Sequence, residues 1–97
     1  MLPAGGIAMN QQIKRKWVKA LLSGKYEQGA RALIRDGRYC CLGVLLACNG
    51  QGRIGGFLDK RELKAFGLTE IQQEHLAGLN DAGVPFDMIA GLIQEAL

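Results

Sequence analysis

The sequence lacks any apolar run approaching the roughly 18 residues that a membrane-spanning helix requires. It also lacks a basic leader, because residues 1–8 contain no lysine or arginine and are interrupted by glycine and proline. Such a start makes a poor signal peptide. Since Met9 follows directly, we interpret residues 1–8 as a disordered tail or an alternative start. These absences predict a cytoplasmic protein without membrane contact, with a single globular domain over residues 9–97.

Histidine and cysteine are scarce, with one and three copies respectively. A disulfide between the neighbours Cys40 and Cys41 would be strained, so reduced thiols fit best. Together with Cys48 and His75 they lack the paired Cys-x-x-Cys spacing of a structural zinc site. We therefore interpret the thiols as buried apolar groups and expect the domain to fold without metal or cofactor. With one imidazole available, a Cys–His nucleophile pair is poorly supported, and we predict no enzymatic activity.

The glycine-rich segment 50–55 matches the dinucleotide fingerprint G-x-G-x-x-G by letter. That fingerprint works only between a strand and a helix in a unit of about 30 residues. A chain of 97 residues without alternating strands and helices does not supply this setting. We interpret residues 49–57 as a flexible loop.

Hydrophobic periodicity predicts a mainly α domain (α+β), with four to five short helices packed against a small β-hairpin. Asn10 is the expected cap of the first helix, and Ser23-Gly24 its end. Residues at helical spacing form the expected buried stripe of this helix: Ile13, Trp17, Val18, Ala20, Leu21 and Leu22.

Asp36-Gly37 predicts a tight two-residue hairpin turn between residues 33–35 and 38–40. The apolar block 41–48 is compatible with a buried strand or a buried helix, and we favour a central helix that ends at Asn49-Gly50. Gly43 would allow another backbone to approach it closely.

Capping signals divide the C-terminal half into three helices. Asp59 and Thr69 each stand three residues before a Glu or Gln, which is the pattern of a capping box. Pro85 suits the first turn of the last helix, after a turn near residues 80–83. The expected apolar residues of the last two helices are Ile71, Leu76, Leu79, Phe86, Ile89, Ala90, Ile93 and Leu97.

The connector after the first helix combines cations, tyrosines, an amide and a glycine, which together suit a nucleotide or another phosphate-bearing ligand. Glycine also lets backbone N–H groups approach an anion. Polar residues of the 80–83 turn could close such a pocket. The candidate ligand-binding residues are Lys25, Tyr26, Gln28, Gly29, Arg31, Arg38, Tyr39, Asn80 and Asp81. The alternative is that the tyrosines flank the core and the charges are merely solvated.

The net charge of +3 is mild, which makes a nucleic-acid partner a weak interpretation. The cations are nevertheless unevenly distributed. Lys14, Arg15, Lys16 and Lys19 share one face of the first helix, whereas no lysine or arginine follows Gly67. The basic N-terminal half and the acidic C-terminal half of the chain could attract each other or a partner, or their charges could simply be solvated.

Three segments resemble a family of small proteins encoded mainly by bacteriophages and prophages. They are the first helix with its connector from Trp17 to Gly29, the block Tyr-Cys-Cys-Leu-Gly-Val-Leu at 39–45, and the segment from Leu79 to Ile93. Residues 46–48 differ from that family, in which a Cys followed by an acidic residue is usual, and Val84-Pro85 replaces a Ser-type cap. The resemblance implies phage origin, and therefore the cytoplasm of a host cell.

Small phage proteins often counter host defence, so by analogy we expect an accessory protein that sequesters an anionic, nucleotide-derived small molecule. A first alternative is a protein-interaction module that inhibits a host defence protein through the basic helix face. A second is a nucleic-acid-binding accessory protein that uses the same face, whose affinity would fall steeply with salt. A homo-oligomer is compatible with each of these.

Overall fold

The computed structural model describes residues 9–51 and 56–97. The expected tail or alternative start at 1–8, and residues 52–55 of the expected loop and fingerprint, lie outside the described residues. The described chain forms five helices and one antiparallel hairpin, which confirms the mainly α class with a small hairpin. In order the elements are α1 Gln11–Leu22, β1 Ile34–Arg35, β2 Arg38–Tyr39, α2 Cys41–Cys48, α3 Lys60–Phe66, α4 Glu70–Asp81 and α5 Phe86–Ala96.

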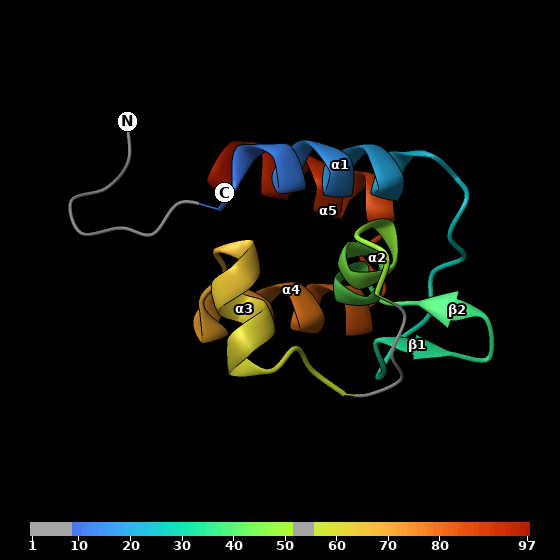
Figure 1. The fold of residues 1–97 in the computed structure, drawn as a ribbon. Coiled ribbons are helices and arrows are strands. Elements are labelled where there is room, and N and C mark those ends of the chain that lie inside the picture. Colours follow the sequence, from blue (N-terminus) through green and yellow to red (C-terminus); the bar gives the residue numbers. More distant parts are fainter. Residues whose placement is uncertain (1–8, 52–55) are drawn as a thin grey trace.

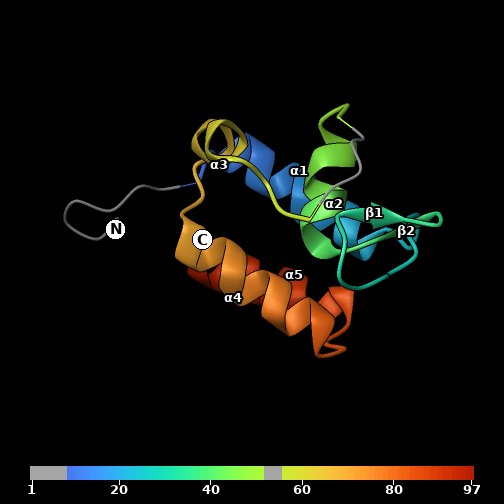
Figure 2. The ribbon, with the colours of Figure 1, turned by 90° about the horizontal axis from the view of Figure 1, so that it is seen from below.

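Helix α2 lies at the centre of the fold. It contacts α1 on one side and α4 on the other, and α5 contacts both α1 and α4 (Figure 1). Seen from below, α4 lies in front of α5, which it contacts, and the hairpin occupies one end of the molecule (Figure 2). Within the described ranges, no helix is long and apolar enough to cross a bilayer.

Helix α1 begins and ends as its sequence predicts. The Asn10 side chain accepts hydrogen bonds from the backbone N–H groups of Gln12 and Ile13, at 2.9 and 3.1 Å. Ser23 caps the other end. Trp17 is fully buried, and its indole Nε1 donates to the carbonyl oxygen of Cys41 at 2.8 Å.

The prediction that Leu22 belongs to the buried stripe of α1 is wrong, because Leu22 is 56% exposed. It lies five positions after Trp17, which places it about 140° around the helix from the tryptophan. The stripe on α1 is therefore narrower than its apolar residues suggest, and one leucine is left on the outer surface.

The apolar block forms a buried helix, α2, and residues 41–46 are all buried. It ends at Asn49-Gly50 as predicted. Gly43 packs directly on the backbone of Leu33, and a Cβ at this position would overlap the Leu33 carbonyl group. This contact confirms the expected close approach and fixes the hairpin against the central helix.

Both predicted capping boxes are present. Asp59 and Glu62 exchange two hydrogen bonds of 2.8 Å at the start of α3. Thr69 and Gln72 exchange hydrogen bonds of 2.9 and 3.0 Å at the start of α4. Pro85 stands one position earlier than expected, as the cap that precedes α5.

The prediction that Ile71 belongs to the buried face of α4 is wrong, because Ile71 is 77% exposed. The inner side of α4 instead buries two polar residues, Gln73 and Asn80, together with Leu76. Gln73 satisfies both its amide atoms on the backbone of Leu58, accepting from its N–H at 2.6 Å and donating to its carbonyl oxygen at 3.3 Å. Both amides are paired with loop backbone, Gln73 with that of Leu58 and Asn80 with that of Gly29.

Candidate functional site

The hairpin turn determines which side chains share a face. Asp36 and Gly37 both have positive φ, at +52° and +76°, as the two-residue turn expected from Asp-Gly requires. The register pairs Ile34 with Tyr39 and Arg35 with Arg38. Because side chains alternate along a strand, both arginines lie on one face and Tyr39 lies on the opposite one.

Asn80 is a buried hydrogen-bonding centre between the connector and α2. Only 2% of it is exposed. Its Oδ1 accepts from Gln28 Nε2 and from the backbone N–H of Cys41, both at 3.1 Å. Its Nδ2 donates to the carbonyl oxygen of Gly29 at 2.7 Å. Both polar atoms of the Asn80 amide are therefore hydrogen-bonded within the protein.

Gln28 links the connector to the segment that leads into α5. Its Nε2 also donates to the carbonyl oxygen of Val84 at 2.8 Å, and its Oε1 accepts from the backbone N–H of Phe86 at 3.1 Å. The Phe86 N–H is at a helix start, where no intrahelical acceptor exists. The geometry gives Gln28 and Asn80 a structural role, because both polar atoms of each side chain already have partners within the protein.

Gly29 lies against β2. Its N–H donates to the carbonyl oxygen of Tyr39 at 2.7 Å, and the N–H of Tyr39 donates to the carbonyl oxygen of Glu27 at 2.8 Å. A Cβ on Gly29 would stand 2.7 Å from the Cβ of Arg38. Glycine is needed here for close packing, and its N–H is directed at the strand and not at an anion.

Arg31 and Asp81 form a second link between the connector and α4. Arg31 has a φ of +66°, which is unusual for a residue with a side chain. Its backbone N–H donates to Asp81 Oδ1 at 2.9 Å. The Arg31 side chain lines a separate hollow of about 230 Å³, which also includes Cys40 and Asp81.

The two tyrosines pack on each other. Their rings meet edge to face, with centroids 4.9 Å apart and planes at 78°. Lys25 Nζ lies 5.6 Å from the centre of the Tyr26 ring. Both tyrosines are partly buried against the core. Lys25, Tyr26 and Tyr39 therefore form one cluster, away from the arginines.

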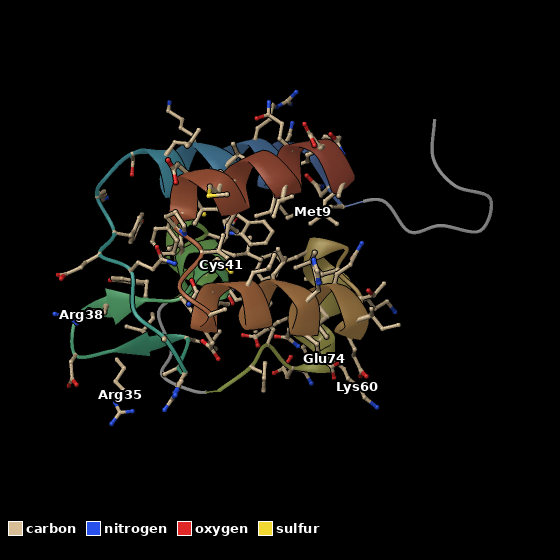
Figure 3. All side chains as sticks on the ribbon, turned by 180° about the vertical axis from the view of Figure 1, so that it is seen from behind. Met9, Arg35, Arg38, Cys41, Lys60 and Glu74 are labelled. Atoms are coloured by element: carbon tan, nitrogen blue, oxygen red, sulfur yellow. The ribbon has the colours of Figure 1, made fainter. Side chains whose placement is uncertain are left out.

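A hollow of about 400 Å³ opens on the arginine face of the hairpin. It is lined by Gly29, Ala30, Ala32, Arg35, Asp36 and Arg38. Figure 3 shows Arg35 and Arg38 at the hairpin end, directed away from the helices. Arg35 was not among the ligand-binding residues predicted from the sequence. The signal for it was present, since an Asp-Gly turn of two residues makes Arg35 the cross-strand neighbour of Arg38.

Each of these arginines has one carboxylate near its Nε. Arg38 Nε lies 3.3 Å from Glu27 Oε1, and Arg35 Nε lies 3.9 Å from Asp36 Oδ2. Within the part of the chain that the structure describes, the terminal nitrogens of both guanidinium groups have no hydrogen bond. These surface pairs are exposed, so they contribute little to stability and can rearrange around a ligand.

The cysteine thiols are packed as apolar groups. Burial raises the pKa of Cys41, with the neighbouring Cys40 thiol as the next cause, and burial also raises the pKa of Cys40. Cys41 Sγ lies 3.6 Å from the carbonyl oxygen of Leu76. Among residues 9–51 and 56–97, no three His, Cys, Asp or Glu side chains come close enough to hold a metal ion. The thiols are protonated and unactivated at neutral pH.

The protein is a small helical domain with one hairpin. The side-chain amides of Gln28 and Asn80 join the connector before the hairpin to α4 and to the start of α5. Residues 9–53 match the family model of a domain of unknown function, DUF8296. The matched segment carries α1, the hairpin and α2, and ends before Asn80. No curated protein and no solved structure gives a match to the chain.

Proposed function

We propose that this protein binds a small anionic ligand, such as the phosphate groups of a nucleotide-derived molecule, in the hollow on the hairpin. Arg35 and Arg38 would contact the anion. The observation that supports the proposal is their position as direct cross-strand neighbours lining the same hollow.

Like charges placed directly opposite each other destabilise a strand pair. Glu27 and Asp36 offset this repulsion only partly, because each contacts one Nε and both are exposed. A phosphate placed between the two guanidinium groups would accept hydrogen bonds from their terminal nitrogens and relieve the repulsion. The repulsion between the two arginines is already present in the ligand-free protein, so its relief would make the binding free energy more favourable.

The backbone that carries the two arginines is held in place before a ligand binds. Its hairpin has a two-residue turn, and Gly29 packs on the Cβ of Arg38. The carbonyl oxygen of Gly29 is in turn held by the buried Asn80. A preorganised backbone lowers the entropic cost of binding.

The proposal is narrower than the expectation from sequence. Tyr26 and Tyr39 pack on each other on the opposite face of the hairpin, so neither is placed to stack on a base that is held by Arg38. Gln28 and Asn80 are bonded internally. Recognition would therefore act through the anionic groups of the ligand, with only Gly29 and Arg38 of the expected residues lining the hollow.

Sequestration needs affinity and copy number, and no catalytic group. In the setting that the phage resemblance implies, the protein would work in the host cytoplasm and withdraw a nucleotide-derived defence signal from its receptor. This biological step follows from analogy with other small phage proteins.

Calorimetric titration with pyrophosphate, cyclic nucleotides and ADP-ribose tests the proposal. Arg38→Ala and Arg35→Ala should each weaken the best ligand by about 1.5–3 kcal/mol, the range for hydrogen bonds to charged groups. Their thermal stability should change little, since both side chains are largely exposed. Arg61→Ala, an exposed arginine on α3, is the matched control and should bind like the wild type.

Two results would count against the proposal. One is that no anion of the panel binds the wild-type protein. The other is that Arg61→Ala weakens binding as much as Arg38→Ala does, which would indicate a nonspecific charge effect.

A further inference from the structure

A second surface lies on α1, remote in sequence from the hairpin site. A hollow of about 800 Å³ runs along the outer side of this helix. Its lining consists of Gln11, Lys14, Arg15, Val18, Lys19, Leu22 and Ser23, together with Gln94 of α5. We call this surface the α1 groove.

The α1 groove combines positive charge with an apolar strip. Lys14, Arg15 and Lys19 line it, and no carboxylate is among its lining residues. In the described ranges, none of the three cations forms an ion pair. Val18 and the exposed Leu22 supply the apolar part. The groove thus has an unneutralised charge of one sign beside a side chain that favours burial.

We propose that the α1 groove docks an acidic, amphipathic helical segment of a partner protein. The groove spans positions 11 to 22, which corresponds to about 17 Å or three helical turns. A helix of that length, with leucines on one side and glutamates flanking them, would cover Leu22 and Val18 and pair with the three cations. Charge complementarity would set the orientation and speed of association, and burial of Leu22 would supply affinity.

The same features disfavour other occupants. The lining has no aromatic side chain, whereas single-stranded nucleic acid is usually held by aromatic stacking. An exposed leucine also contributes nothing to a phosphate contact. A membrane surface would need the apolar face of α1, but Trp17 and Leu21 of that face are buried in the core. An acidic protein segment uses both the cations and the leucine.

The test uses a fluorescein-labelled peptide of about 14 residues, with leucines along one face of a helix and glutamates at the two edges of that face. A peptide of the same composition in scrambled order is its control. We expect the wild-type protein to bind the amphipathic peptide at least about tenfold more tightly than the scrambled one. Backbone amide signals of α1 and of Gln94 should shift in NMR spectra on binding.

Variants separate the contributions of charge and apolar contact. Leu22→Ala and Lys19→Glu should each weaken the peptide by about tenfold or more. Lys64→Glu makes the same charge reversal on α3 and should change binding by less than about twofold, since it is outside the groove. Because Leu22 and Lys19 are exposed, circular dichroism should show unchanged folding for both variants.

Three outcomes would overturn this proposal. The first is equal affinity for the amphipathic and scrambled peptides, because charge alone would then explain binding. The second is tighter binding of duplex DNA or of anionic lipid vesicles at the same groove. The third is concentration-dependent dimerisation that Leu22→Ala abolishes, since a second copy would then be the occupant. The hairpin proposal is independent, because Arg35→Ala and Arg38→Ala should leave peptide binding unchanged.

Discussion

Asn80 Nδ2 donates a hydrogen bond of 2.7 Å to the carbonyl oxygen of Gly29, a residue 51 positions earlier in the chain. The same buried side chain accepts hydrogen bonds from Gln28 and from the backbone of Cys41. One amide thus joins the connector, the start of the central helix and the end of α4.

Replacement of Asn80 by alanine should therefore destabilise the fold by about 3–5 kcal/mol, because it leaves several buried polar groups without partners. Urea denaturation followed by circular dichroism measures this change. Asn80→Asp should also destabilise, since a carboxylate cannot donate to the Gly29 carbonyl oxygen. The neighbouring Asp81→Ala serves as a control and should cost about 1 kcal/mol or less, because the Arg31 N–H that it releases is exposed. Similar losses for Asn80→Ala and Asp81→Ala would show that Asn80 does not anchor the site.

Trp17 provides a second stability prediction. It is fully buried and contacts the core through its whole ring, so Trp17→Ala should lower the unfolding free energy by about 3–5 kcal/mol. Trp17→Phe retains an aromatic ring but loses the hydrogen bond to the Cys41 carbonyl oxygen, so a smaller loss of about 1–3 kcal/mol is expected. Thermal and chemical unfolding of both variants give the comparison, and an unchanged stability of Trp17→Phe would contradict a role for the indole N–H.

Two glycines in helices should respond oppositely to alanine. Gly43→Ala would force a Cβ into the Leu33 carbonyl group and should destabilise by about 2 kcal/mol or more. Gly78 lies on α4 with open space around its Cβ position, so Gly78→Ala should stabilise by about 0.5–1 kcal/mol. An unchanged or raised melting temperature for Gly43→Ala would show that Gly43 is not packed against Leu33 in solution.

The buried thiols predict a loss of stability at alkaline pH. Burial raises the pKa of Cys41 above the ordinary thiol value of 9.0, so the folded protein retains a proton that the unfolded chain releases. The stabilisation from this shift is complete below pH 9.0 and decreases as pH rises through and beyond that value. For one thiol the slope approaches about 1.4 kcal/mol per pH unit.

Unfolding free energies of the wild type and of Cys41→Ala, measured between about pH 8 and pH 10, isolate this effect from lysine and tyrosine titration. The variant should lose less stability over that interval. Cys48→Ala is a useful comparison, because Cys48 is only partly buried and nearby Lys16 opposes the effect of burial on its pKa. Parallel pH profiles for wild type and Cys41→Ala would contradict the prediction.

The connector shows where prediction of the site from sequence succeeded and failed. Gln28 does lie against Asn80, Arg31 against Asp81, and Tyr26 against Tyr39. Their roles were not predictable, because Gln28 acquires its partners from residues 80, 84 and 86. The Gln28 amide, which the sequence suggested could bind a ligand, is therefore hydrogen-bonded within the protein. The exposed residues Leu22 and Ile71 failed as predictions for a related reason, since the width of a buried stripe depends on what packs against it.

Local signals in the sequence predicted most helix ends and the hairpin turn. Asn10, Asp59 and Thr69 cap helices, and Asp36-Gly37 forms the hairpin turn, because capping and turn formation involve residues within three or four positions of each other. Which polar groups remained accessible depended on long-range packing. Hydrogen bonds such as that between Asn80 and Gly29 join residues far apart in the chain, and local propensity contains no information about such pairs. The same long-range packing left Arg35, Arg38 and Leu22 on the surface, where binding is proposed.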